Sequence, residues 1–205
     1  MTRLVLVRHG ETLWHRENRY AGTSDVELSP HGRDQARALA EWATTAALDG
    51  VWASTLSRAK ETAQACVDLT GTRLVTDERL RELDFGDAEG LTRQEMDVRF
   101  PDAARDFLRD PVRHPLPGGE DPVRAARRFT SCLRDIAERH TTGRVLVVAH
   151  STVIRLALCS LIGVEMSRYR RLFPALGNCA LTEVRLDASD FALLEFNTPI
   201  DRRTP

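Results

Sequence analysis

Apolar and polar residues follow one another along the chain in blocks that predict strands and helices in turn. Short apolar runs that end in glycine or polar residues predict buried strands, and apolar residues spaced three or four apart predict amphipathic helices. The predicted strands cover residues 4–7, 51–53, 73–76, 145–149, 180–186 and 192–196. The predicted helices cover residues 30–47, 58–69, 92–100, 103–109, 121–140 and 151–162.

The segments between these elements carry residues that favour turns and helix ends. Ser29 is suited to cap the helix that Pro30 begins, because serine accepts backbone N–H groups and proline fits the first turn. Residues 13–28 are expected to be irregular, and residues 79–91 form a predicted loop with two glycines. Pro101 is expected to separate two short helices, and a turn is expected at 187–190.

Strands that alternate with helices favour an α/β fold. We expect a three-layer α/β/α sandwich on a mainly parallel sheet of about six strands, with one antiparallel strand contributed by the closing pair. No repeat, low-complexity tract or linker divides the sequence. Residues 1–205 are therefore predicted to form a single domain, with residues 92–120 as a helical insert that roofs the site.

Composition excludes several classes of partner. The 29 basic and 30 acidic residues give a net charge of -1, so neither a nucleic-acid nor a membrane partner is expected. The sequence shows no signal-peptide pattern and no long apolar run, which predicts a cytoplasmic protein. Its four cysteines have no Cys-x-x-Cys spacing, which predicts reduced core thiols. A homodimer is compatible with the sequence, which does not set the oligomeric state.

The first candidate chemistry lies at the end of the first predicted strand, where Arg8, His9 and Gly10 follow an apolar run. Open α/β sheets bind ligands at the carboxyl ends of their strands. Histidine can act as a nucleophile or base near neutral pH, and arginine binds phosphate or carboxylate with a fixed fork of donors. On its own, this tripeptide is equally compatible with a strand end that happens to be polar.

Polar residues also follow three other predicted strands, namely Arg58, Glu82 and His150. Taken singly, they could be a solvated arginine, a solvated carboxylate and a satisfied core histidine. A parallel sheet would bring them to one edge together with Arg8 and His9. Two arginines, two histidines and a carboxylate suffice for phosphoryl transfer without a metal or cofactor. The arginines neutralise phosphate, one histidine attacks phosphorus, the other donates to an oxygen, and the acid protonates the leaving group.

Five ordered motifs resemble those of the histidine phosphatase superfamily, in the branch that contains cofactor-dependent phosphoglycerate mutases. The resemblance spans nearly the whole chain and rests on the segments Arg8–Thr12, Leu28–Ala36, Ala53–Ala63, Leu80–Gly90 with Pro117–Glu120, and Val147–His150. It implies that His9 takes the phosphoryl group and that Arg8, Arg58 and His150 hold the phosphate. It also implies that Glu82, protonated, is the acid for the leaving group and then the base for water.

The chain departs from the family pattern at two positions. His15 stands where the family usually has an asparagine that contacts phosphate, and Ser151 stands where it often has glycine. His15 can still donate one hydrogen bond, and would add charge when protonated, so phosphate affinity could depend more on pH. A solvated histidine is an equally good interpretation. Ser151 keeps the backbone donor and adds a hydroxyl group near the phosphate.

The spacing between Glu82 and His150 favours a phosphatase over a mutase. Mutases of this family tend to carry a longer insert that covers the site, whereas these residues are only 68 positions apart. The resemblance therefore implies a metal-independent phosphomonoester hydrolase whose partner is a small phosphorylated metabolite that the sequence does not identify. A phosphoglycerate mutase-type transferase and a non-catalytic phospho-ligand-binding protein are the alternatives. Five insert residues are candidates for substrate contacts or solvated helix charges: Arg93, Arg99, Arg105, Arg109 and Arg113.

Overall fold

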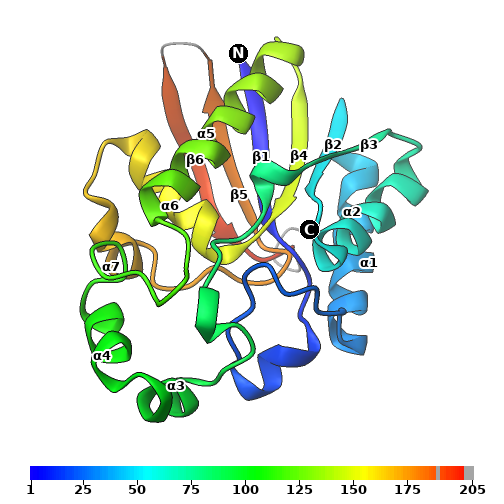
Figure 1. The fold of residues 1–205 in the computed structure, drawn as a ribbon. Helices are drawn as coiled ribbons and strands as arrows, with labels where there is room; N and C mark the ends of the chain where they lie inside the picture. Colours follow the sequence, from blue (N-terminus) through cyan, green and yellow to red (C-terminus); the bar gives the residue numbers. More distant parts are fainter. Residues whose placement is uncertain (188–189, 201–205) are drawn as a thin grey trace.

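A six-stranded sheet with helices on both faces forms the centre of the protein (Figure 1), as seen in a computed structural model that describes residues 1–187 and 190–200. Residues 188 and 189 of the turn predicted at 187–190 lie outside the described residues. The strands are β1 (Thr2–Arg8), β2 (Gly50–Ser54), β3 (Leu74–Asp77), β4 (Arg144–Ala149), β5 (Leu181–Leu186) and β6 (Phe191–Thr198). The α-helices are α1 (Pro30–Thr45), α2 (Ser57–Thr70), α3 (Arg93–Arg99), α4 (Pro101–Arg109), α5 (Pro122–Arg139), α6 (Ser151–Ile162) and α7 (Tyr169–Leu172).

The strand order is β3-β2-β4-β1-β5-β6. The pairs β2–β3, β2–β4 and β1–β4 are parallel, while β5 runs antiparallel to both β1 and β6. Among the described strands, β5 is therefore the one that runs against the others. This confirms the predicted mainly parallel sheet with one antiparallel strand, and it places the carboxyl ends of β1, β2 and β4 side by side.

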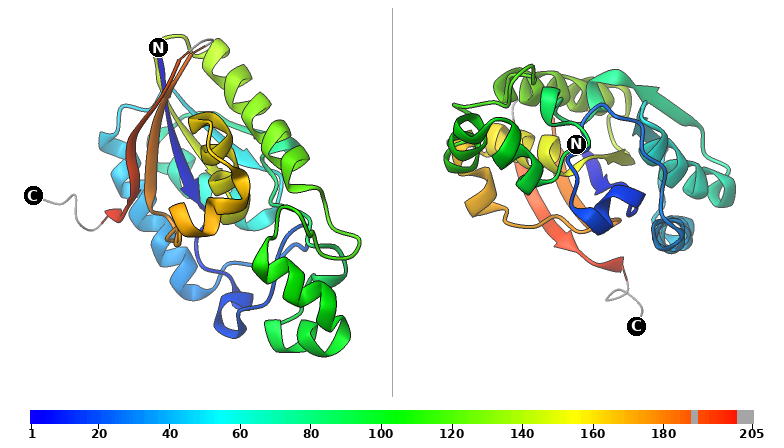
Figure 2. Two further views of the ribbon diagram at one scale, coloured as in Figure 1. Left: turned by 90° about the vertical axis from the view of Figure 1, so that its left-hand side faces the viewer. Right: turned by 60° about the horizontal axis from the view of Figure 1, so that its bottom comes forward.

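Side chains of β1 alternate between two apolar cores, one on each face of the sheet. Leu4 and Leu6 pack with residues of α5 and α6, while Val5 and Val7 pack with residues of α1 and α2. The two helical layers are visible on either side of the sheet in Figure 2. Burial of both faces explains why the central strands read as continuous apolar runs.

The predicted helix ends are confirmed where a capping residue stands in the sequence. Ser29 Oγ accepts a hydrogen bond from the Gly32 N–H at 3.0 Å, and Pro30 begins α1. Two expectations are wrong in detail: a 3₁₀ helix, η1 (Leu13–Glu17), lies within the stretch expected to be irregular, and Pro101 begins α4 instead of standing between two helices. Further short 3₁₀ helices are η2 (Glu78–Leu80), η3 (Gly86–Ala88) and η4 (Met166–Arg168).

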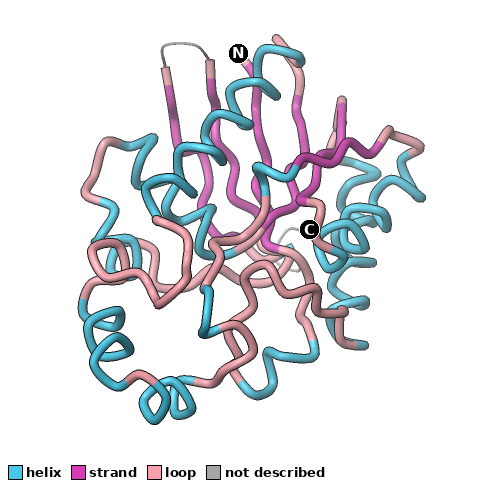
Figure 3. Tube along the Cα trace, viewed as in Figure 1, coloured by secondary structure: helices cyan, strands magenta, loops and turns pink. Residues whose placement is uncertain are grey.

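A third, smaller core lies beyond the carboxyl ends of the strands, where loops and short helices gather (Figure 3). Phe107 of α4 packs edge-on against Tyr20 and Phe85, with ring centroids 6.0 and 6.4 Å apart. The helices of the insert are therefore anchored on the loops that follow β1 and β3. All four cysteines are buried free thiols, as predicted, and none of the described helices is long and apolar enough to cross a membrane.

Candidate active site

The parallel register of β1 and β4 brings two histidines together. Arg8 stands opposite Ala149, and the His9 N–H donates to the Ala149 carbonyl at 3.0 Å. The next residues on the two strands, His9 and His150, consequently have ring centroids 5.1 Å apart. Both rings are buried, at 5% and 0% exposure. The sequence prediction that these residues share one edge of the sheet is confirmed.

Hydrogen bonds define the tautomer of His9. Its Nδ1 lies 2.7 Å from the Gly10 carbonyl, which can only accept, so Nδ1 carries the proton. Nε2 is then a lone pair, and it accepts a hydrogen bond from Arg58 Nε at 3.2 Å. Burial, followed by the nearby charges of Arg58 and Arg8, holds the pKa of His9 well below its usual range. The ring is therefore neutral and presents a nucleophilic nitrogen.

Arg58 is fully buried and held by a loop whose carbonyl oxygens face it. It donates to Ser24 O and Gly22 O at 2.7 Å each, and to Ala21 O at 3.3 Å. The other side of the same loop is held by Glu89, whose carboxylate accepts from the N–H groups of Gly22, Thr23, Ser24 and Phe85. Loop 21–24 thus lies between a cation and an anion, which fixes the guanidinium against His9.

His150 has no hydrogen-bond partner for either ring nitrogen within the described part of the chain. Burial, reinforced by Arg58, lowers the pKa of His150 well below its usual range. A buried polar atom left unpaired costs about 1–3 kcal/mol. A ligand that hydrogen-bonds to the ring would remove that cost, which is the expected property of a binding residue and not of a satisfied core histidine.

Arg8 is turned toward the site by the chain segment before β5. Its Nη1 donates to Leu176 O at 3.0 Å, and its Nη2 donates to His15 Nε2. His15 Nδ1 accepts a hydrogen bond from the Thr12 N–H at 3.0 Å and lies 2.7 Å from Thr12 Oγ1, so both ring nitrogens have a partner. Burial lowers the pKa of Arg8 to about 10 and that of His15 to about 4, the latter also through the charge of Arg8. His15 is consequently a neutral member of the site and not a solvated loop residue.

Glu82 lies at the amino end of α6, where backbone N–H groups attract a carboxylate. Oε1 accepts from Leu83 N and Val153 N at 2.9 and 2.8 Å, and Oε2 accepts from Thr152 N at 2.9 Å. Its own backbone is held by Arg128 of α5, which donates to Glu82 O at 2.8 Å and pairs with Glu120. Oε2 has the greater remaining capacity for a proton or a ligand.

A cavity of about 380 Å³ opens over these residues, and it reaches solvent beside the exposed Asn18. Five of the seven predicted site residues line it directly: Arg8, His9, His15, Glu82 and Ser151. The other two predicted residues lie beside His9: Arg58 donates a hydrogen bond to it, and the His150 ring packs against its ring. Its remaining lining residues are Thr12, Asn18, Arg19, Tyr20, Ala21, Phe85, Thr152 and Arg155. Among the described residues, no group of three or more His, Cys, Asp or Glu side chains is arranged to hold a metal ion.

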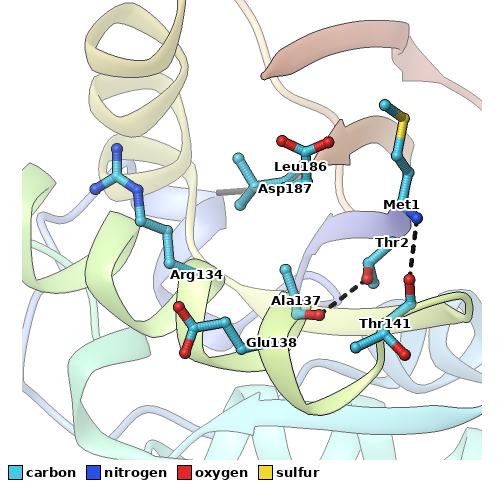
Figure 4. Close-up of a pocket in the computed structure, with 8 residues that line it drawn as sticks. All are labelled: Met1, Thr2, Arg134, Ala137, Glu138, Thr141, Leu186 and Asp187. Carbon is cyan, nitrogen blue, oxygen red and sulfur yellow. Dashed lines mark hydrogen bonds between the residues drawn. The ribbon is translucent and has the colours of Figure 1, made fainter. Parts of the chain in front are cut away.

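The insert arginines lie away from this cavity. Arg93, Arg105, Arg109 and Arg113 are mostly exposed and lie near aspartates close by in sequence, so they are the solvated helix charges that one interpretation expected. Another cavity, of about 280 Å³, lies beside Thr2 at the opposite end of β1 (Figure 4). It is formed by α5 and the ends of β1 and β5, and it contains none of the predicted site residues.

Several residues that support the site were not found from the sequence. Thr62 accepts from the Gly10 N–H at 3.1 Å, and Asn178 donates to His9 O at 2.7 Å. Glu89 and Arg128 hold the loops, and Arg155 lines the cavity. The contacts of Thr62 with Gly10, Arg128 with Glu82 and Asn178 with His9 join residues 52, 46 and 169 positions apart along the chain. No local pattern marks such contacts.

Comparison with known proteins agrees with this geometry. The family model of the histidine phosphatase superfamily, branch 1, matches residues 4–199. Phosphoserine phosphatase 1 of Hydrogenobacter thermophilus is 31% identical over 169 residues, which cover 82% of this chain and 80% of that protein. Phosphoglycerate mutase-like protein 4 of Arabidopsis thaliana is 38% identical over 155 residues, or 74% and 67% of the two chains. The solved structure of Bacillus stearothermophilus YhfR has a TM-score of 0.91, with 29% identity and coverage of 97% and 98%.

The chain therefore belongs to the histidine phosphatase superfamily, branch 1, and is an enzyme of that family. The resemblance found in the five sequence motifs is confirmed over nearly the full chain.

Proposed function

We propose that the protein hydrolyses small phosphomonoesters without a metal, through a phosphohistidine intermediate on His9. The observation that carries this proposal is the state of the His9 ring. Its Nδ1–H is held by Gly10 O, and its Nε2 lone pair lies in a buried site beside Arg58. A neutral imidazole with a fixed tautomer is prepared to attack phosphorus, since the nucleophilic nitrogen needs no base to remove a proton.

Three groups are suited to bind the phosphate. The fully buried Arg58 and the partly buried Arg8 supply positive charge, and arginine binds phosphate oxygens with paired donors. His150 supplies a ring whose nitrogens lack other partners in the described structure. His15 and Ser151 add polar atoms on the cavity wall, so that they complete the phosphate-binding set.

Glu82 serves as general acid and then as general base. Oε2, which accepts a single N–H, is the oxygen with room for the proton that is transferred. As His9 Nε2 bonds to phosphorus, the ester P–O bond breaks and the Glu82 proton moves to the alcohol oxygen. Water then attacks the phosphohistidine and gives a proton to Glu82, the N–P bond breaks, and inorganic phosphate leaves.

Phosphoglycerate mutase activity is the second candidate, because one relative at 38% identity is named a phosphoglycerate mutase-like protein. Both reactions share the phosphohistidine step, and they differ in whether water or a second substrate takes the phosphoryl group. The cavity reaches solvent beside Asn18, which favours water and therefore hydrolysis.

Turnover of para-nitrophenyl phosphate with and without EDTA tests the proposal. We expect hydrolysis at pH 5–8 that EDTA leaves unchanged and that His9→Ala abolishes. Loss of activity in EDTA would contradict the metal-free mechanism, and full activity in His9→Ala would contradict the role of His9. Supplying 3-phosphoglycerate with its bisphosphate separates the two reactions, since a mutase yields the isomer and a phosphatase yields free phosphate.

A further inference from the structure

Arg155 occupies a fixed place on the wall of the cavity, one helical turn after Ser151. Its Nε donates to Ser151 O at 3.1 Å, and its Nη1 donates to Phe173 O at 3.2 Å. The guanidinium carbon lies 4.9 Å from the centre of the Tyr169 ring, a cation–π contact. These three contacts orient the group but leave Nη2 without an acceptor among the described residues.

Among the residues that the structure describes, Arg155 has no acidic ion-pair partner. Arg19, which lines the same cavity, pairs with Glu17 and Glu95, whereas Arg155 forms no ion pair within residues 1–187 and 190–200. The carboxylate that acts on it electrostatically, Glu82, is already bonded to three backbone N–H groups.

The neighbouring charges of Arg155 are also positive. Arg170 stacks on the same Tyr169 ring and lowers the pKa of Arg155, and the charge of Arg155 in turn lowers the pKa of Arg8. Burial is the largest influence that lowers the pKa of Arg155. A partly buried cation that has like charges nearby and no ion-pair partner among the described residues is suited to bind an anion, because a bound anion relieves both the repulsion and the lost hydration.

We propose, on the basis of the hydrolase function above, that Arg155 binds a carboxylate on the alcohol portion of the substrate. The preferred substrates are then small phosphomonoesters that bear a carboxylate a few bonds from the ester oxygen. Arg8 and Arg58 take the phosphate, which leaves one uncompensated positive charge for one further negative charge. The free edge of a guanidinium also fits the two coplanar oxygens of a carboxylate. The cavity of about 380 Å³ has room for the phosphate together with a small carboxylated alcohol.

Matched pairs of substrates test this inference. O-phosphoserine is compared with O-phosphoethanolamine, and 3-phosphoglycerate with glycerol 3-phosphate, because the second member of each pair lacks the carboxylate. We expect kcat/KM of the wild type to favour the carboxylated member by roughly tenfold to a hundredfold, the range of one charged hydrogen-bonded contact. In Arg155→Gln the preference for the carboxylated substrate should fall to about threefold or less, chiefly because the KM for that substrate rises.

Two variants control for loss of charge and loss of packing. Arg105→Gln removes the same charge from an exposed position on α4 and should keep the wild-type preference. Arg155→Lys retains the positive charge but not the paired donors of the guanidinium, and its preference for the carboxylated substrate should lie between those of the wild type and Arg155→Gln. Circular dichroism shows whether each variant folds. If Arg155→Gln does not fold, the wild-type preference and its reduction in Arg155→Lys decide the question.

Failure of this inference differs from failure of the proposed function. If the wild type hydrolyses para-nitrophenyl phosphate but treats both members of each pair equally, the assignment of Arg155 is wrong and the hydrolase stands. A folded Arg155→Gln variant that keeps the full preference would also overturn it. If no phosphomonoester is hydrolysed, the proposed function itself is wrong.

Discussion

The two buried imidazoles, His9 and His150, should make the stability of the ligand-free enzyme fall steeply in mild acid. Both rings stay neutral in the folded state because burial and nearby arginines hold their pKa values well below the usual range. In the unfolded chain each ring takes up a proton near pH 6.5. Below that pH the unfolded state binds more protons than the folded state, so the free energy of unfolding decreases as the pH falls.

The size of this effect follows from the number of rings that fail to protonate. Each contributes about 1.4 kcal/mol per pH unit once the pH is well below 6.5. Between pH 7.5 and pH 5.0 this amounts to about 2 kcal/mol per ring, and about 4 kcal/mol for the pair. Domains of this kind are typically stable by about 5–15 kcal/mol, so the loss is readily measured.

Urea unfolding in phosphate-free buffers at pH 7.5 and 5.0 provides the assay. Comparison with variants is needed because carboxylates also titrate in this range. His9→Asn and His150→Asn should each lose about 2 kcal/mol less than the wild type between the two pH values, and the double variant about 4 kcal/mol less. A double variant that loses as much stability as the wild type would refute the claim that both rings are neutral in the folded protein.

Three further predictions concern the groups around His9. Glu89→Gln weakens the clamp on loop 21–24, so urea unfolding should show a loss of roughly 2–3 kcal/mol, the value of hydrogen bonds to a charged group. Arg58→Lys cannot make the four contacts of the guanidinium, and kcat/KM should fall about a hundredfold, whereas an unchanged value would contradict its place in the site. His15 protonates near pH 4 without ligand, and bound phosphate favours its charged form. Inhibition by phosphate should therefore strengthen more as the pH falls from 7 to 5 in the wild type than in His15→Asn.

Much of the fold could be predicted because its determinants are local. Buried strands such as β4 read as uninterrupted apolar runs, and Ser29 with Pro30 marks the beginning of α1. The six strands, six of the seven α-helices among the described residues, the sheet class and the one antiparallel strand are therefore predicted correctly, whereas the short α7 is not. The 3₁₀ helix η1 was missed, since its capping interaction uses His15, a residue that carries no ordinary helix-start preference.

The position of the site could be predicted because parallel strands end at one edge. This rule predicts that Arg8, His9 and His150 lie close together, and the register of β1 with β4 confirms that prediction. The supporting contacts could not be predicted, because they join distant segments. Asn178 is 169 positions from His9, and the Phe173 carbonyl that helps to orient Arg155 is 18 positions from it.

Two glycines near His9 also make a close contact that the sequence alone does not predict. A Cβ on Gly10 would collide with the backbone carbonyl of Gly32, and one on Gly32 would collide with the carbonyl of Glu11. In both cases the obstacle is backbone, which cannot easily move aside. The loop after β1 and the first turn of α1 can therefore approach this closely only because both positions are glycine. The sequence contains both glycines, but their mutual packing appears only in the fold.

Direct detection of the phosphoryl group on His9 tests the central claim. The enzyme is mixed with phosphomonoester labelled with radioactive phosphate, and the reaction is stopped in alkali within the first turnovers. We predict a label on the protein that survives alkali, is released by acid and is absent from His9→Ala, as the N–P bond of phosphohistidine requires. Rapid hydrolysis of the same ester with no protein-bound label at any time would contradict the account.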